Sequence, residues 1–187
     1  MKVIQNGICA AKGFKAGACL CGIRKNQSKD DLAMIYSIQP CNCAATYTTN
    51  KVKAAPLKVT KNHLQNGIAQ AVIVNSGNAN ACNPVEMENA ELEAKVAADL
   101  LGIDTNDVIV ASTGVIGQPL PIACIQENAH CIELSEAGND KAAKAILTTD
   151  TVEKVIAVEF DIHGTTVKMG GICKGSGMIH PNMGTML

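Results

Sequence analysis

The stretch Ala71-Val-Ile-Val-Asn-Ser-Gly-Asn-Ala-Asn80 indicates how this chain folds, because a β-branched apolar run changes abruptly into small polar residues. Short apolar runs bounded by turn residues are typical of buried strands. A second example of the pattern is Val108-Ile-Val-Ala111 followed by Ser112-Thr-Gly-Val-Ile-Gly117. We therefore predict two central strands, each ending in a polar loop. In open α/β folds, loops at the carboxyl ends of strands hold ligands. Taken alone, however, each loop is better explained as a turn that uses glycine and asparagine.

The segment from Glu88 to Leu101 separates these two strands and has the apolar spacing of a helix. Gly102 follows it as the expected C-terminal cap. The apolar residues that we expect to face the core are Leu92, Val96, Ala97 and Leu100. Strand, helix and strand in succession predict an α/β fold.

Further elements are expected on both sides of this unit. Helices are predicted from Pro121 to about Leu134 and from Asp140 to Leu147. Lys154–Phe160 and Thr165–Met169 alternate apolar and polar residues and predict a hairpin that turns at His163-Gly164. The N-terminal third predicts short strands and turns.

Composition limits the class of protein. The chain has 187 residues, of which 47% are hydrophobic and 18% charged, so a well-buried core is expected. We expect residues 1–187 to form a single α/β domain. The formal charge of −1 and the lack of a basic run argue against a nucleic-acid partner. No signal peptide or membrane-span pattern is found, and we expect a cytoplasmic protein.

Cysteine and histidine give no metal pattern. Nine cysteines in a chain without a signal peptide predict reduced, buried, small apolar side chains. Cys19-Leu-Cys21 and Cys41-Asn-Cys43 have one residue between the thiols, which is a poor zinc chelate, so core packing is favoured. The histidines share no ligand spacing and are expected on the surface or in the hairpin. They are His63, His130, His163 and His180.

A third glycine-rich loop is predicted over Gly170–Gly177. Its spacing does not match a phosphate-binding P-loop, because Ser176 stands where that motif requires lysine and Lys174 precedes the glycine. A nucleotide site is therefore not favoured.

The ending Pro181-Asn-Met-Gly-Thr-Met-Leu187 carries a potential nucleophile. Breaking the peptide bond between Gly184 and Thr185 would give Thr185 both its hydroxyl and a free α-amine. The amine, with a pKa of about 7.7–8.0, could accept the hydroxyl proton. Cutting at this bond would therefore activate Thr185.

Taken together, these segments resemble the glutamate N-acetyltransferase family, also called ornithine acetyltransferase. The matching segments occur in family order and span nearly the whole chain. They are Val74–Cys82, Ala111–Gly117, Ile146–Thr151, Lys174–Ile179 and Pro181–Leu187. The family fold is a layered α/β sandwich that resembles N-terminal-nucleophile hydrolases but differs from them in topology.

The resemblance implies a precursor that cuts itself before Thr185 into an α chain and a β chain. Thr185 would be the nucleophile, and Thr113 and Gly114 would form the oxyanion hole. Thr148 and Lys174, together with Thr185, would bind the amino-acid substrate. The family usually has alanine before the nucleophile, where this chain has Gly184. The β chain would start at Thr185 and continue beyond Leu187, and residues 1–187 alone are expected to be inactive.

The function implied by the resemblance is transfer of an acetyl group from N-acetylornithine to glutamate in arginine biosynthesis, by a ping-pong mechanism without metal or organic cofactor. Its partners would be these small molecules and its own β chain in an α/β hetero-oligomer. Whether acetyl-coenzyme A also serves as donor stays open. The alternatives are a self-cutting amidohydrolase or aminopeptidase, which passes the acyl group to water, and a non-catalytic binding subunit of the same fold.

Overall fold

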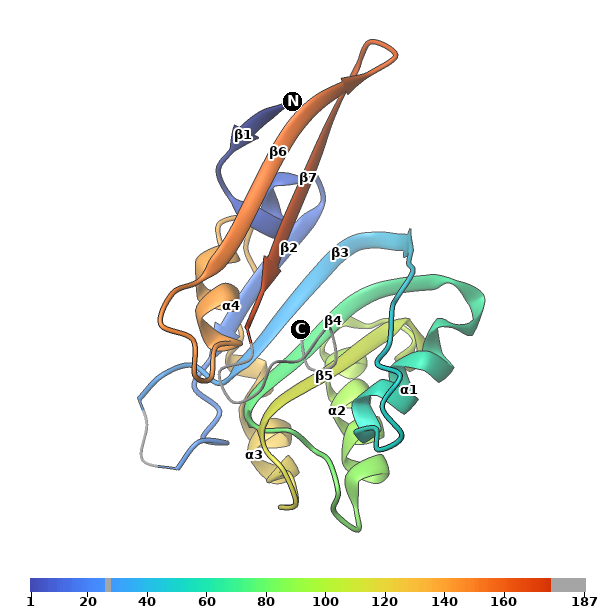
Figure 1. The fold of residues 1–187 in the computed structure, drawn as a ribbon, viewed down its shortest axis with the longest axis vertical. Coiled ribbons are helices and arrows are strands. Elements are labelled where there is room, and N and C mark those ends of the chain that lie inside the picture. Colours follow the sequence, from blue (N-terminus) through green and yellow to red (C-terminus); the bar gives the residue numbers. More distant parts are fainter. Residues whose placement is uncertain (26–27, 176–187) are drawn as a thin grey trace.

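A computed structural model describes residues 1–25 and 28–175. The predicted roles of Ser176, His180, Gly184 and Thr185 lie outside these residues. Within the described ranges the strands form two sheets (Figure 1). The four-stranded sheet has the order β2-β3-β4-β5, with β2 Phe14–Cys19, β3 Leu32–Asn42, β4 Ile68–Asn78 and β5 Val108–Val115. The three-stranded sheet has the order β1-β6-β7, with β1 Lys2–Ile4, β6 Lys154–Ile162 and β7 Thr165–Cys173.

Helices connect and cover these strands. The α-helices are α1 Ala55–His63, α2 Glu86–Leu101, α3 Ile122–Asn128 and α4 Asn139–Ala145. Short 3-10 helices are η1 Gly7–Ala10, η2 Leu64–Asn66, η3 Thr105–Asp107 and η4 Ala129–Cys131. Of the strand pairs in the larger sheet, β4 and β5 are parallel and the other two are antiparallel. The parallel pair is joined through α2, as a crossover connection requires.

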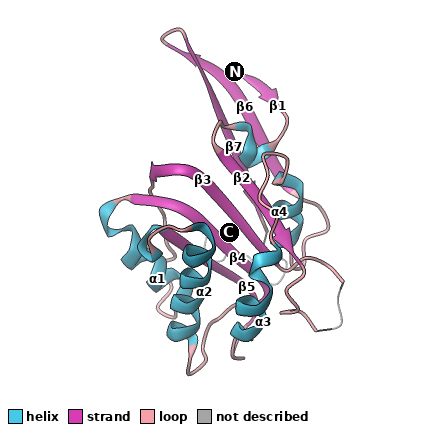
Figure 2. Cartoon of the chain, turned by 180° about the vertical axis from the view of Figure 1, so that it is seen from behind, coloured by secondary structure: helices cyan, strands magenta, loops and turns pink. Residues whose placement is uncertain are grey.

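The four-stranded sheet is covered differently on its two faces, because successive side chains of a strand point to opposite faces. α1, α2 and α3 lie on one face (Figure 2). They form a core with Leu32, Met34, Ile73, Val108 and Val110. On the other face, α4 and Ile172 of β7 pack against Ala33, Val72, Val74 and Ala111. The predicted layered α/β arrangement is therefore present.

The two central strands and the hairpin are confirmed, but the predicted loops after them are partly wrong. Strand β4 continues through Asn78 and β5 through Val115, so most of both polar segments lies within strands. Likewise β7 runs to Cys173 and takes up residues 170–173 of the predicted third loop. Polar and glycine residues remain in the strands here because backbone pairing with a neighbouring strand outweighs their low strand propensity.

The helix between the central strands is also confirmed, with Gly102 as its C-cap at φ 67°. Its buried side was predicted correctly for Ala97, and Val96 also packs against the core, but Leu100 was placed there wrongly. The buried residues are Asn89, Ala90, Glu93, Ala94, Ala97 and Ala98, whereas Leu92 and Val96 are half-buried and Leu100 is 47% exposed. Small alanine side chains let the helix axis approach the sheet closely, which a leucine at the same positions would prevent.

Two long elements of the N-terminal third were not predicted. They are the eleven-residue strand β3 and helix α1. A register irregularity between Tyr36 and Cys41 interrupts β3 and contains Pro40, at the kind of position where a strand tolerates proline. The helix predicted from Pro121 is shorter than expected: α3 ends at Asn128 and continues as a 3-10 turn to Cys131.

The expectation that the cysteines are buried holds for some of them only. Cys9, Cys19 and Cys21 are buried, and all nine thiols are free. Cys41, Cys43, Cys124 and Cys173 are half-buried, while Cys82 and Cys131 are exposed. Cys82 is exposed because it lies in the turn between β4 and α2, at a positive φ of 58°. Among the described residues, no helix combines the length and the apolar character needed to cross a membrane.

Glu93 of α2 gives a testable consequence of this packing. Its side chain is fully buried, and neither carboxylate oxygen has a hydrogen-bond partner among the described residues. Burial raises the pKa of Glu93 well above its usual value of 4.5. The folded state therefore holds the Glu93 proton more tightly than the unfolded state does. The contribution of this proton to the free energy of unfolding falls as the pH rises above 4.5 towards the raised pKa of the folded state.

We expect Glu93→Met to raise the free energy of unfolding by roughly 1–3 kcal/mol at about pH 8, because the buried polar group is removed. The gain should be smaller at about pH 5, where the unfolded state also keeps part of the proton. Urea denaturation at both pH values measures the difference. The control is Glu88→Met on the exposed side of the same helix, with an expected change within about 0.5 kcal/mol. An equal gain for Glu93→Met at both pH values would contradict the assignment.

Candidate active site at the ends of β4 and β5

The ends of the two parallel strands bring Thr113 into position. Ser76 of β4 pairs with Thr113 of β5, two residues beyond the pair Val74 and Ala111. Val74 and Ala111 pack on the α4 face of the sheet. Because side chains two residues apart share a face, the hydroxyls of Ser76 and Thr113 lie side by side on that face.

Gly114 is required by the close approach of the neighbouring strand. Its φ is +140°, and a Cβ at this position would lie 2.3 Å from the Gly77 carbonyl carbon and 2.5 Å from the Asn78 nitrogen. Both contacts are to backbone atoms, which cannot rotate away. The sequence pattern had suggested a glycine turn, and the structure gives a different reason: two backbones meet here at a β-bulge.

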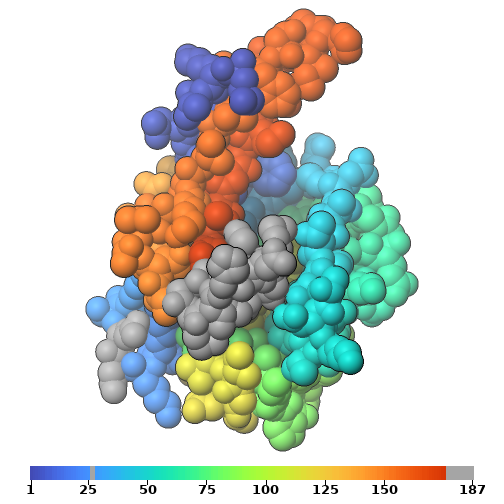
Figure 3. Space-filling model, viewed as in Figure 1, coloured from blue at the N-terminus to red at the C-terminus, as the bar shows by residue number. Residues whose placement is uncertain are grey.

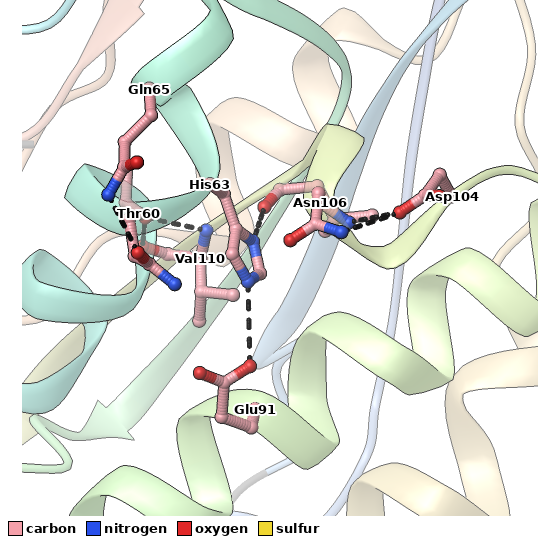
Figure 4. A network of polar contacts seen from close by, with 9 residues as sticks. Thr60, His63, Gln65, Glu91, Asp104, Asn106 and Val110 are labelled. Atoms are coloured by element: carbon pink, nitrogen blue, oxygen red, sulfur yellow. Dashed lines mark hydrogen bonds and ion pairs between the residues drawn. The ribbon is translucent and has the colours of Figure 1, made fainter.

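The strand also determines where the Gly114 N–H points. The outer edge of β5 is the one that faces away from β4. There the Val110 N–H donates to Thr60 Oγ1 at 3.0 Å, and Thr60 Oγ1 donates to the Val110 C=O at 2.9 Å (Figure 4). On the inner edge, the C=O of Val115 accepts from Ala79 N at 2.9 Å. In a parallel pair, alternate residues direct their backbone groups to opposite edges. Gly114 has the parity of Val110, and from this alternation we expect its N–H to face the outer edge of the sheet.

Ser76 links this strand end to the C-terminal end of α4. Its Oγ donates to the Ala145 carbonyl at 2.5 Å and accepts from Arg24 Nη2 at 2.5 Å. The same Arg24 nitrogen donates to the Leu147 carbonyl. The half-buried Thr148 is the next residue along the chain. These bonds hold Thr148 close to the Ser76–Thr113 pair.

Arg24 and Asp31 were not identified from the sequence. The Asp31 carboxylate is fully buried and accepts from the backbone N–H groups of Cys21 at 2.7 Å and Arg24 at 2.9 Å. It thereby fixes the loop from which the Arg24 side chain reaches Ser76. Burial lowers the pKa of Arg24, and the nearby Asp31 charge opposes this effect. A single aspartate before an apolar strand gives no sequence signal for such a role.

Lys174 follows β7 and is 5% exposed. Its Nζ donates to the Gly175 carbonyl at 2.7 Å. Burial lowers the pKa of Lys174, while the Asp150 charge raises it. A buried ammonium group with polar contacts is suited to hold an anionic group such as a carboxylate.

Asp150 connects Lys174 to the Thr148 segment. Its Oδ1 accepts from Gly175 N at 2.7 Å and from Lys154 Nζ at 2.6 Å. Burial alone would raise the pKa of Asp150, but the bonds from Lys154 and Gly175 outweigh it and lower that pKa. Asp150 lies two residues after Thr148. Hydrogen bonds therefore tie residues 145–147 to the end of β4 through Ser76 and Arg24, and Asp150 ties the segment after Thr148 to Gly175 at the end of β7.

Two hollows of about 620 and 450 Å³ lie away from these residues. The first is lined by residues of η1 with Phe14, Glu136, Thr166 and Lys168. The second is lined by residues 62–66 and 104–107 that include His63 and Asp104. Neither contains a residue predicted to act in catalysis. Among the described residues, no group of three or more His, Cys, Asp or Glu side chains is arranged to hold a metal ion.

His63 corrects the expectation of a surface residue. It is 4% exposed, and its Nδ1 lies 2.8 Å from the Val108 carbonyl while its Nε2 lies 3.4 Å from Glu91 Oε2 (Figure 4). With Thr60, it covers the outer edge of β5 from α1. The side chains of His63 and Thr60 therefore bond to the outer backbone edge of β5 up to Val110. The part of β5 after Val110, which includes Gly114, lies beyond these two side chains. His130 is exposed and His163 lies in the hairpin turn, as predicted.

Comparison with known proteins gives a consistent result. The sequence model of the family described as the ArgJ family matches residues 15–187 of this chain. The arginine biosynthesis bifunctional protein ArgJ of Gloeobacter violaceus is 53% identical, over 98% of this chain and 46% of that protein. A glutamate N-acetyltransferase of Methanococcus maripaludis is 44% identical, over 97% of this chain and 44% of that protein. The chain spans about half the length of the curated relatives it matches.

Solved structures of similar proteins share the fold. A crystal structure of the arginine biosynthesis bifunctional protein ArgJ from Bacillus halodurans has a TM-score of 0.90 at 40% identity, over 99% of this chain and 97% of that chain. An ornithine acetyltransferase from Mycobacterium tuberculosis, complexed with ornithine, has a TM-score of 0.88 at 34% identity, over 100% of this chain and 99% of that chain.

Two glycines of the β5 end allow a matched test of its geometry. Gly114 and Gly117 both have positive φ, but a Cβ on Gly117 would meet nothing within 4 Å. Gly117→Ala should therefore cost only backbone strain, of order 1 kcal/mol, whereas Gly114→Ala should cost several times more because the backbones must separate. Chemical denaturation of both variants measures the difference, and equal losses would contradict the close approach.

Proposed function

This chain belongs to the ArgJ family, and from that premise we propose that the whole protein transfers an acetyl group from N-acetylornithine to glutamate in arginine biosynthesis. The observation that carries the proposal is the end of β5. There a hydroxyl, from Thr113, and a backbone N–H, from Gly114, are held by strand pairing at adjacent residues. Acyl transfer passes through a tetrahedral oxyanion, which two fixed donors of this kind would stabilise.

Thr185 is the proposed nucleophile, after cutting between Gly184 and Thr185. Its Oγ would attack the acetyl carbonyl while its α-amine takes the hydroxyl proton. The tetrahedral intermediate would then collapse with breakage of the C–N bond, and the amine would return the proton to the leaving ornithine nitrogen. Glutamate would take the acetyl group from the acetyl-threonine through the same steps in reverse.

Thr148 and Lys174 are proposed to bind the amino-acid substrate. Lys174 supports this role because its side chain is buried and its ammonium group donates to the Gly175 carbonyl. A substrate carboxylate would give this ammonium group an opposite charge to bind. Ornithine, with which the similar Mycobacterium tuberculosis enzyme is complexed, is an amino acid and carries such a carboxylate.

The comparison lengths support cutting into two chains. This chain covers 46–48% of the first curated relatives, yet it covers 97% and 99% of the two solved chains. Those solved chains therefore have about half the length of the curated relatives. We propose that the whole protein likewise consists of an α chain and a β chain, assembled as a hetero-oligomer.

The proposal is tested by expressing the full-length protein and analysing it by mass spectrometry and by assay. We expect a second fragment that begins with Thr185, and acetyl transfer from N-acetylornithine to glutamate that is faster than release of free acetate. The variant Thr185→Ala should be neither cut nor active. Protein that is active while uncut would disprove the mechanism, and release of acetate without transfer would favour a hydrolase.

Replacement of Thr113 gives a second prediction. Thr113→Ala should lower kcat about 10²–10³-fold, the usual cost of losing one oxyanion-hole donor. Thr113→Ser, which keeps the hydroxyl, should recover most of the activity. Steady-state kinetics of the two variants provide the measurement. If Thr113→Ala retains the parent kcat, the hydroxyl is not an oxyanion donor.

A further inference from the structure

The two faces of the hairpin β6–β7 differ in character. Even-numbered residues of β6 pair with odd-numbered residues of β7, and Val3 of β1 pairs with Val158. Since paired residues share a face, the register collects one set of side chains on one side of this sheet. Lys154 and Thr165 lie at its two ends, and we call its large apolar members the apolar face: Val3, Ile156, Val158, Phe160, Ile162, Val167 and Met169.

The apolar face is largely uncovered within the described residues. Val3 is 70%, Ile156 60% and Met169 60% exposed, while Ile162 is 47% exposed. Phe160, one of only two phenylalanines in the chain, is half-buried. The hairpin extends away from the rest of the molecule as an arm (Figures 1 and 3). A contiguous group of large apolar side chains on such an arm is characteristic of an interface.

The opposite face of the same sheet has its partner already. Ala157 is buried there, and a Cβ on Gly170 would lie 1.7 Å from the Gly7 carbonyl oxygen of η1. Beyond η1, that face carries the charged residues Glu159 and Asp161. Towards the turn of the hairpin, this face is therefore polar, whereas the other face is apolar.

The outer edge of β7 is a second unsatisfied feature of the arm. Strand β7 has nine residues and lies at the edge of its sheet, with β6 as its partner among the described residues. Long edge strands are normally protected, because their free N–H and C=O groups pair readily with another strand. An apolar face beside an open edge fits a partner that packs on the face and can extend the sheet.

We propose that the apolar face is covered by the second half of the protein, the part that the curated relatives contain in addition to the span matched here. This inference rests on the proposed function, which places that half after Thr185. The curated relatives are about twice as long as this chain, so a partner of comparable size is available. Strand β7 leads through Lys174 towards Gly184 and Thr185. The following half is thus covalently joined to the strand that carries the face, which gives it a high local concentration before cutting.

Two native methionines test this in the full-length protein. Met169 on the apolar face is 60% exposed here and Met87 of α2 is 41% exposed. Under mild peroxide treatment, followed by mass spectrometry of the digest, Met169 should oxidise about tenfold more slowly than Met87, because oxidation follows exposure. Oxidation of Met169 at the rate of Met87 or faster would overturn the proposal.

A photoreactive amino acid in place of Ile156 identifies the occupant. A cross-link to a peptide beyond residue 187 is expected. A cross-link to residues 1–187 of another molecule would mean that a second copy covers the face, and it would overturn the proposal, as would no cross-link to the second half. Neither measurement needs cutting or activity, so the two proposals can fail separately. If the protein is uncut and inactive but Met169 is protected, only the proposed function is disproved. If the protein is cut and active but Met169 is exposed, only this inference is disproved.

Discussion

The parallel pairing of β4 with β5 is the constraint on which the candidate site depends. It places Ser76 beside Thr113 and Gly77 beside Gly114, and it orients the backbone groups of alternate residues to fixed edges. The pairing requires glycine at position 114, since the backbone of β4 occupies the space of a side chain. An N–H positioned by strand pairing does not have to be organised when a substrate binds, which is the condition for effective oxyanion stabilisation.

The packing around this pair explains the unusual composition of the chain. Only 2% of its residues are aromatic, and the α4 face of the sheet is built from small residues such as Ala16, Ala33, Ala142 and Ala145. Small side chains bring α4 close enough for the Ala145 carbonyl to accept directly from Ser76. The chain therefore gives up part of the apolar area that larger side chains would bury. In exchange, backbone and short polar groups come within hydrogen-bonding distance of one another.

The polar groups that organise the site are themselves held by buried carboxylates. Asp31 fixes the loop that carries Arg24, and Asp150 joins the segment after Thr148 to Gly175. Asp31 accepts two backbone N–H groups and Asp150 accepts one, so each determines the path of the chain. By contrast, the buried Glu93 of α2 has no such bond among the described residues. The apolar face of the β6–β7 arm likewise leaves large apolar side chains exposed within the described part of the chain.

The sequence by itself determined the strand–helix–strand unit, the hairpin and the chemical candidates, because these depend on local patterns. The β-branched runs before Asn75 and Ser112, the cap at Gly102 and the turn at His163-Gly164 are all short-range signals. The proposed roles of Thr113, Gly114, Thr148 and Lys174 came instead from the resemblance of their motifs to those of a known family. Only the tertiary structure decided that the polar segments continue as strands, that His63 covers a sheet edge, and that Arg24 and Asp31 support Ser76. Those features arise from contacts between residues far apart in the chain, where backbone pairing and burial outweigh the preferences of the individual residues.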